Sequence, residues 1–144
     1  MTGRTFRVSA DLARRLEWWL VVLIAAHTFT VGAALLAVPE WALRFGGWAA
    51  IPPLFFPRQA GVFHLVLGTG YLVEFRRTRG IVLLLTAKAC ATVFLLGASV
   101  FSGVPWFVTF AGVADGLMGA SAVAARALVS RAGARGSAAS DSSS

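Results

Sequence analysis

The sequence has little of what marks a soluble enzyme or a disulfide-stabilised domain. Its one cysteine, Cys90, excludes an intrachain disulfide and every CxxC or Cys/His zinc motif, and only 13% of the 144 residues are charged. Hydrophobic residues make up 58% of the chain. A soluble domain of this size could not bury so much apolar surface, because small folds leave a large share of their area in water. The composition therefore predicts a membrane protein.

Long apolar runs are what the sequence has instead. Four of them have the length that a transmembrane helix needs, about 20 residues. They cover residues 18–38, 58–75, 81–101 and 105–128. The first run follows a basic segment, as in a signal peptide, but it is longer than a usual signal core, and we interpret it as an uncleaved span. The predicted fold class is all-α: an integral membrane four-helix up-down bundle.

The remaining segments lack the pattern of spans. Residues 1–17 form a basic arm, with spacing that allows a short amphipathic helix on anionic lipid. Residues 39–57 are interrupted by proline and glycine yet are too apolar for a free loop. We expect them to lie in the membrane interface between the first and second spans. Residues 129–144 are rich in Ser, Ala and Gly and predict a disordered tail.

Basic residues predict the orientation of the spans. Ten arginines lie in the amino-terminal arm, the turn after the second span and the carboxyl end, whereas only Arg44 and Arg58 lie at the opposite ends of the spans. Because positively charged loops stay in the cytoplasm, both termini are predicted to be cytoplasmic. The arginines form no patch interleaved with aromatic residues, so the net charge of +7 does not predict binding to nucleic acid. The predicted partner is the lipid bilayer.

Ionisable residues inside the predicted spans are the candidate functional residues. They are His27, His64, Lys88 and Asp115. A charged side chain inside a bilayer is costly and usually faces a partner or a water-filled cavity. Lys88 and Asp115 come from consecutive antiparallel spans at similar heights, so we expect them to be able to pair. Such a pair either titrates protons or binds an anion, or it only fixes the register of the helices.

The two histidines leave several interpretations open. His27, His64 and Asp115 offer groups that suit zinc or iron, but no HxxxH or ExxH spacing supports a metal, and we predict none. A proton relay is a second interpretation. Hydrogen bonding between helices, without chemistry, is the third. Arg58, at the start of the second span, is either an interfacial anchor or a contact for an anion or headgroup.

Small residues follow one face of the second and fourth spans. In RQAGVFHLVLGTGYLVE, residues Gly61, His64 and Gly68 share a face with Tyr71 at its margin. The fourth span carries three more glycines on one face, Gly112, Gly116 and Gly119. Small residues let helices approach closely in lipid. We expect the two glycine faces to pack against each other, with homodimerisation as the alternative.

Four segments resemble a known family. They are PEWALRFGG, RQAGVFHLVLGTGYLVEFRR, TAKACATVFLL and FAGVADGLMGA. Together they are similar to the small four-helix DoxX-like membrane proteins of bacteria, over about residues 18–128. The resemblance implies a four-span bundle in the bacterial inner membrane. Named members of the family are associated with quinone-linked sulfur oxidation as part of a larger complex, but no residue here is assigned a catalytic role from it.

The sequence predicts the architecture more closely than the activity. The leading hypothesis is a non-enzymatic accessory or small-molecule binding bundle, with a membrane protein or a lipophilic small molecule as partner and no cofactor that the sequence identifies. A component of a membrane oxidoreductase, binding a quinone or another lipophilic ligand near His64, Tyr71, Lys88 and Asp115, is the first alternative. A small proton-coupled exporter is the second.

Overall fold

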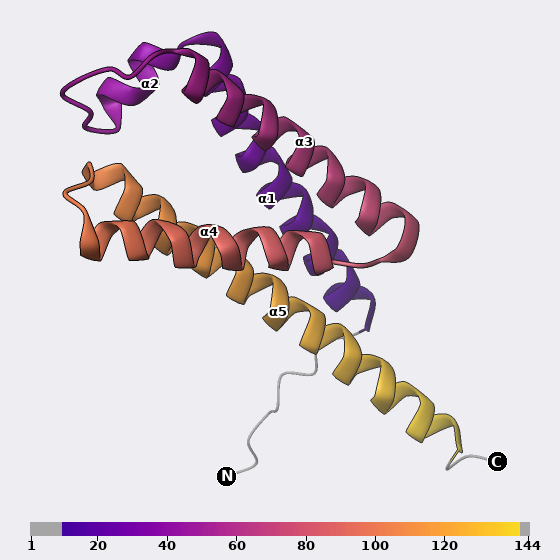
Figure 1. The fold of residues 1–144 in the computed structure, drawn as a ribbon. Helices are drawn as coiled ribbons and strands as arrows, with labels where there is room; N and C mark the ends of the chain where they lie inside the picture. The colour runs from indigo at the N-terminus through magenta and orange to yellow at the C-terminus, as the bar shows by residue number, and fades with distance from the viewer. Residues whose placement is uncertain (1–9, 142–144) are drawn as a thin grey trace.

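The chain is helical wherever its structure is described. The computed structural model describes residues 10–141, with side chains as far as Ala134, and in this part it contains five helices and no strand (Figure 1). They are α1 (Ala10–Ala37), α2 (Pro39–Phe45), α3 (Phe55–Thr78), α4 (Val82–Phe101) and α5 (Trp106–Asp141). The all-α class is confirmed.

Proline and a left-handed residue set several of the helix ends. Pro39 occupies the first turn of α2, where its missing N–H is not needed. At the C-terminal end of α3, Arg79 has a φ of 55°, and its N–H donates to the carbonyl of Phe75 at 3.1 Å. This left-handed cap ends the helix and turns the chain into α4 within a few residues.

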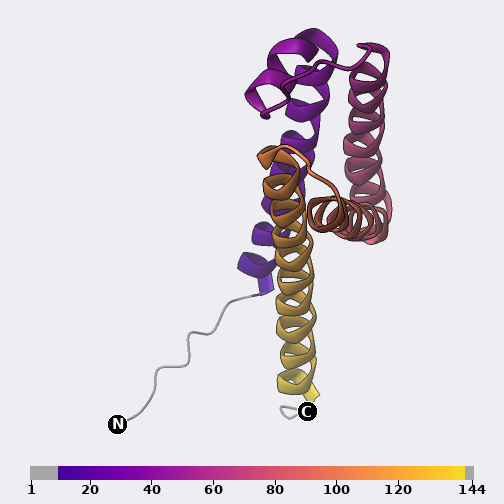
Figure 2. The ribbon, with the colours of Figure 1, turned by 60° about the vertical axis from the view of Figure 1, so that its left-hand side comes forward.

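The four long helices form two pairs that diverge. The first pair is α1 with α3, and the second is α4 with α5. Figures 1 and 2 show α1 and α5 crossing, whereas α3 and α4 meet at their connecting turn and separate from there. The helices therefore do not run side by side over their full lengths, as an idealised up-down bundle would have them.

The main hydrophobic core lies where the pairs cross. All four long helices contribute to it, and Ile81, just before α4, belongs to it too. Its buried members are Val21, Ile24, Ala25, Tyr71, Phe75, Ile81, Leu84 and Ala122. Tyr71, expected only at the margin of the glycine face, is 2% exposed and belongs to this core.

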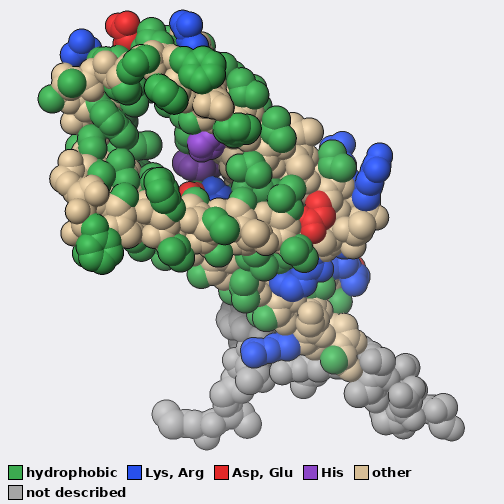
Figure 3. Space-filling view, viewed as in Figure 1, with side chains coloured by type: hydrophobic (Ala, Val, Ile, Leu, Met, Phe, Trp, Pro, Cys, Tyr) green, Lys and Arg blue, Asp and Glu red, His purple; other side chains and the backbone are tan. Residues whose placement is uncertain are grey.

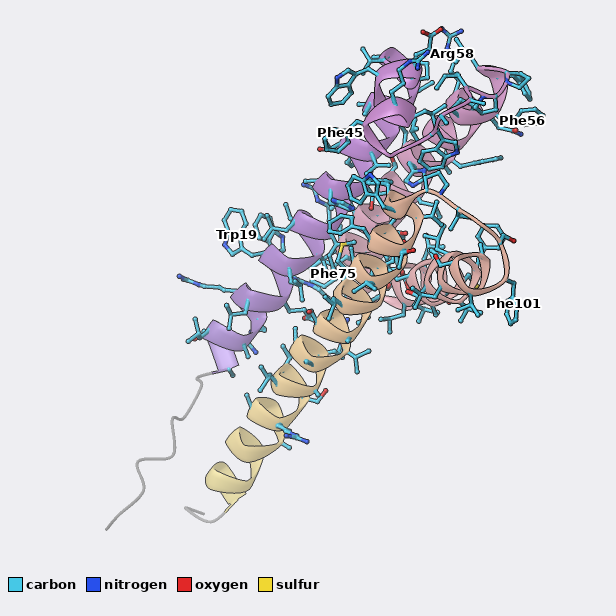
Figure 4. The ribbon with its side chains drawn as sticks, turned by 90° about the vertical axis from the view of Figure 1, so that its left-hand side faces the viewer. Trp19, Phe45, Phe56, Arg58, Phe75 and Phe101 are labelled. Carbon is cyan, nitrogen blue, oxygen red and sulfur yellow. The ribbon has the colours of Figure 1, made fainter. Side chains whose placement is uncertain are left out.

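Three helices are long and apolar enough to cross a membrane by length and composition. They are α1, α4 and residues Trp106–Ala134 of α5. Large apolar side chains cover much of their surface and of the outer face of α3, and Figure 4 shows Trp19 of α1, Phe56 of α3 and Phe101 of α4 projecting outward. These three are 57%, 61% and 88% exposed. An apolar exterior of this kind is suited to lipid rather than water.

Ion pairs and caps hold one end of the molecule together. We call it the basic end and define it by Glu17, Glu74, Arg79 and Arg126. Arg126 Nε of α5 lies 2.9 Å from Glu17 Oε1 of α1, and the same guanidinium donates to the carbonyl of Arg79. The Arg79 guanidinium also lies over the ring of Phe75, 5.4 Å from its centroid. This end therefore joins α1, α5 and the turn from α3 to α4.

Two predicted boundaries differ from the structure. The basic arm was expected to end at Glu17, but α1 begins at Ala10 and Glu17 is 4% exposed. Residues 1–9, which include part of that arm, lie outside the described residues. The predicted disordered tail is also not what is seen, because α5 continues to Asp141. The segment has no proline and contains several alanines, which favour continuation of a helix.

The glycine faces have partners other than those expected. A methyl group added at Gly61 would come within 2.8 Å of the carbonyl oxygen of Gly32, so the close approach is between α1 and α3. Gly68 packs against the ring of Phe29, also on α1. On α5, the glycines face α4. Gly112 lies against Leu95 and Leu96, Gly116 against Thr92, and Gly119 against Lys88. The prediction that the two faces pack together was wrong, because each glycine helix pairs with a different neighbour.

Candidate functional site

Four helices each contribute an ionisable residue to one region above the core. His27 comes from α1, His64 from α3, Lys88 from α4 and Asp115 from α5. His27 lies within electrostatic range of the other three. The structure therefore brings these four residues of the predicted spans together. We call them the polar cluster.

Lys88 and Asp115 form an ion pair, as their similar heights on consecutive predicted spans allow. Lys88 Nζ donates to Asp115 Oδ1 at 2.5 Å, and the two side chains are 8% and 16% exposed. Gly119 lies one turn further along α5 and leaves room for the stem of Lys88. A buried cation and carboxylate in direct contact have no net charge between them. The pair therefore adds polarity to the site without an excess of either sign.

His64 is held in one tautomer by its own helix. Its Nδ1 lies 2.7 Å from the carbonyl oxygen of Ala60. A carbonyl oxygen can only accept a hydrogen bond, so in the neutral ring the proton is on Nδ1. Nε2 then carries the lone pair and is left as an acceptor. Because Gly32 of α1 lies against the Cβ of His64, the base of this side chain is fixed as well.

His27 and Tyr71 complete the surroundings of the pair. His27 is exposed, one turn along α1 from the buried Ile24, and its ring has no hydrogen bond to the described part of the chain. Tyr71 is buried and lies within electrostatic range of Asp115. The structure thus places all five predicted ligand or proton-relay candidates in one neighbourhood: four of them form the polar cluster, and Tyr71 lies at its boundary with the core.

The polar cluster borders a hollow between the two helix pairs. Figure 3 shows this hollow between α2 with α3 on one side and α4 on the other, rimmed by hydrophobic side chains. The histidines lie at its inner edge, and an acidic and a basic side chain are visible just below them. We call this inner edge, which the polar cluster forms, the floor of the hollow. Apolar side chains around a few polar groups are the usual composition of a small-molecule site.

Aromatic contacts close one side of the hollow. We call this part the aromatic end and define it by Trp41, Phe45, Trp48, Trp106 and Phe107. The Phe45 and Trp106 ring centroids are 6.1 Å apart at 71°, an edge-to-face contact between α2 and α5. Gly47 has a φ of 92°, and a side chain there would meet the Trp106 ring. The predicted interfacial segment therefore contains a short helix that touches the start of α5.

Arg58 and the lone cysteine lie apart from the hollow and its floor. Arg58 is exposed near the aromatic end (Figure 4), beside a shallow surface depression that Phe55 and Phe63 also line. Cys90 is exposed on α4. Among the described side chains, no group of three His, Cys, Asp or Glu residues is close enough to hold a metal ion.

Sequence reasoning missed the ion pair between the buried Glu17 and the partly exposed Arg126. On sequence alone, Glu17 is only the last residue of the basic arm, and Arg126 is one of the arginines that predict the orientation. The available signal was position: both residues lie on an otherwise apolar helix face, Glu17 four residues before Val21 and Arg126 four after Ala122. An acidic and a basic residue continuing one core stripe on two helices indicates that they meet.

Comparisons with known proteins give no relatives for this site. No family model matches the chain, no curated protein matches it, and no solved structure matches it.

Proposed function

We propose that this chain is a four-span membrane protein that binds a small lipophilic molecule in the hollow between its helix pairs. The proposal includes the DoxX-like resemblance, whose four segments fall on α2, α3, α4 and α5. It places the protein in the bacterial inner membrane with both termini cytoplasmic. The observation that carries the binding function is the polar cluster at the floor of an apolar hollow (Figure 3).

The case for α3 as the fourth span rests on its partner and its outer face. Its 24 residues make a helix about 36 Å long, enough for a bilayer core of about 30 Å. It packs antiparallel along α1, from Gly61 against Gly32 to Gly68 against Phe29. Between its charged ends, most of its exposed side chains are apolar, with Phe63 57% and Val66 62% exposed. Gly61, Gly68 and Tyr71, which lower its average hydropathy, are buried.

The charge distribution supports the orientation. At the basic end, Arg76, Arg77 and Arg79 flank the turn from α3 to α4, and Arg126 lies nearby. The opposite end has Arg44 and Arg58, with Glu40 in the same short segment as Arg44. An excess of arginine at one end favours retention of that end in the cytoplasm.

Thiol labelling tests the orientation. In a Cys90→Ala background, Ala50→Cys places a thiol at the aromatic end and Arg77→Cys places one at the basic end; both positions are exposed. A membrane-impermeant maleimide should label the Ala50→Cys protein in spheroplasts and the Arg77→Cys protein only after lysis. The reverse pattern, or equal labelling of both, would overturn the proposed topology.

Mass spectrometry of co-purifying molecules tests the binding function. His27→Trp would fill the hollow without removing the Lys88–Asp115 pair. Cys90→Trp adds the same bulk on the exposed face of α4, about 200° round the helix from Lys88. The wild type and Cys90→Trp should retain an apolar compound at a fixed ratio to protein, and His27→Trp should lose most of it. Retention by all three, or no compound beyond bulk lipid in the wild type, contradicts the proposal.

A further inference from the structure

We infer that the hollow is built for a neutral lipophile that carries a hydroxyl group, and that His64 Nε2 accepts the hydrogen bond from that hydroxyl. The inference rests on the proposed function and adds the chemical class of the ligand. It follows from the hydrogen-bonding capacity that the polar cluster has left, from its balance of charge and from the way the hollow opens.

Hydrogen-bonding capacity at the floor of the hollow favours a donor on the ligand. The Nδ1 proton of His64 is used by the Ala60 carbonyl, so Nε2 can only accept while the ring is neutral. Lys88 gives one of its three N–H groups to Asp115, so the cluster also keeps N–H donors, and a hydroxyl can donate to Nε2 and accept from one of them. An O–H group is the simplest ligand group that donates to such an acceptor. A ketone, ether or ester has only acceptors and would leave Nε2 unpaired.

Charge balance argues against a charged ligand. An anion could bind Lys88 only by competing with Asp115, which is already 2.5 Å from the ammonium group. A cation would have to compete with Lys88 for Asp115 in the same way. Removing one partner from a buried pair is costly, because the other charge is left without compensation. A neutral ligand leaves the pair intact.

The route into the hollow favours a molecule that is dissolved in the bilayer. Helices α3 and α4 touch only near their connecting turn and diverge beyond it (Figures 1 and 2). At the other end, the Phe45–Trp106 contact narrows access along the helix axes. In the proposed orientation, the gap between α3 and α4 therefore opens sideways into lipid. Apolar walls then hold the hydrocarbon part while the hydroxyl reaches His64.

Three matched probes test the inference in nanodiscs made of phosphatidylcholine, because this lipid has no O–H donor of its own. 4-Nonylphenol has the hydroxyl, 4-nonylanisole replaces its proton with a methyl group, and 4-nonylbenzoate is an anion. Saturable binding above partitioning into empty nanodiscs is measured for each. Wild type should bind the phenol about tenfold more tightly than the anisole, the value of one hydrogen bond, and more tightly than the benzoate.

Variants then assign the acceptor. His64→Phe should bring phenol binding down to the level of the anisole, and His64→Gln, whose amide oxygen can accept, should restore part of the difference.

Equal binding of phenol and anisole by the wild type overturns the hydroxyl inference but leaves the proposed function standing, since a site still exists. Preference for the benzoate overturns the neutral-ligand inference in favour of Lys88. Absence of saturable binding for all three probes contradicts both proposals. The comparison of probes on wild type needs no variant to fold.

Discussion

The basic end and the aromatic end of the molecule are built in opposite ways. At the basic end, α1, α5 and the turn from α3 to α4 are joined by Glu17, Arg126 and Arg79, next to the buried core. At the aromatic end, the two helix pairs have separated, and they are connected by contacts of Phe45 and Gly47 with Trp106. Charged side chains therefore hold the helices together at the basic end, whereas at the aromatic end the separated helix pairs leave a hollow between them.

The polar cluster lies between these two arrangements, which explains how it is kept in place. Below it, the crossing of the pairs fixes the helices. Above it, each pair is held together by its own glycines, Gly61 against Gly32 in one and Gly112 against α4 in the other. The structure therefore keeps close packing within each pair and opens only the space between the pairs. A site at that junction can be open to a ligand without loosening either pair.

The largest expected effect comes from breaking the Lys88–Asp115 pair. Lys88→Met should lower the free energy of unfolding by about 3–5 kcal/mol, because Asp115, whose side chain is only 16% exposed, would lose its partner. Unfolding in mixed micelles titrated with dodecyl sulfate, followed by circular dichroism, measures this change.

The matched control is the double variant Lys88→Met with Asp115→Leu. It removes both charges together, so we expect most of the lost stability to return. If the double variant is as unstable as Lys88→Met alone, the pair contributes through packing of the Lys88 stem rather than through charge. In that case the polar cluster would stabilise the protein in the same way as the apolar core below it, by packing.

The sequence predicted the helices and the polar cluster because both depend on local patterns or height along a span. Apolar runs and prolines placed the helices to within a few residues, except where α1 begins early and α5 continues to Asp141. The cluster followed from counting residues along antiparallel helices. Lys88 and Asp115 could be paired in this way because they lie on consecutive spans.

Which helix faces which could not be predicted from the same patterns. A glycine face indicates close packing but not its partner, so Gly61 was assigned to the wrong helix. Glu74 shows the same limit. Arg76 and Arg77 follow it within one turn of α3, but its carboxylate accepts hydrogen bonds from the backbone N–H groups of Val82 and Leu83. The left-handed Arg79 turns α4 back toward it, a consequence of the turn that residue spacing on α3 does not reveal.

The second prediction concerns packing within a pair. Gly61→Ala should destabilise the protein by about 1–3 kcal/mol, because the new methyl group would meet the backbone of α1 at 2.8 Å and cannot be avoided by a change of rotamer. Gly112→Ala should cost less, since its nearest atom, at 2.9 Å, is the end of the flexible Leu96 side chain. The same unfolding titration measures both.

Gly97→Ala is the control for these glycine variants. No atom outside its own helix surroundings lies within 4 Å of the added methyl group, and alanine is the better helix former. We expect no loss of stability, or a small gain. Equal losses at Gly61 and Gly97 would show that helix propensity, rather than the approach of α1 to α3, controls the result.

The third prediction tests the fastening at the basic end. Arg126→Gln should lower the free energy of unfolding by about 1–2 kcal/mol, because Glu17 is buried and would lose its cation. The effect should be smaller than that of Lys88→Met, since the Arg126 side chain is 34% exposed and water can reach the site. Arg131→Gln, at an exposed position further along α5, is the control and should have no measurable effect. A larger loss at Arg126 than at Lys88 would reverse the proposed order of the two pairs.

The smallest expected effect is the loss of the cap on α4. In Glu74→Ala the N–H groups of Val82 and Leu83 lose a carboxylate that lies 3.0 Å from each, and the stability should fall by about 1 kcal/mol. Glu40→Ala, an exposed acidic residue in the first turn of α2, is the matched control and should cost less. Because the cap fixes where α4 leaves the basic end, Glu74→Ala should also raise amide exchange at Val82 and Leu83 more than at the buried Leu84. Uniform exchange along all of α4 would instead mean that the angle between the helix pairs is set by the core alone, and that the turn only connects them.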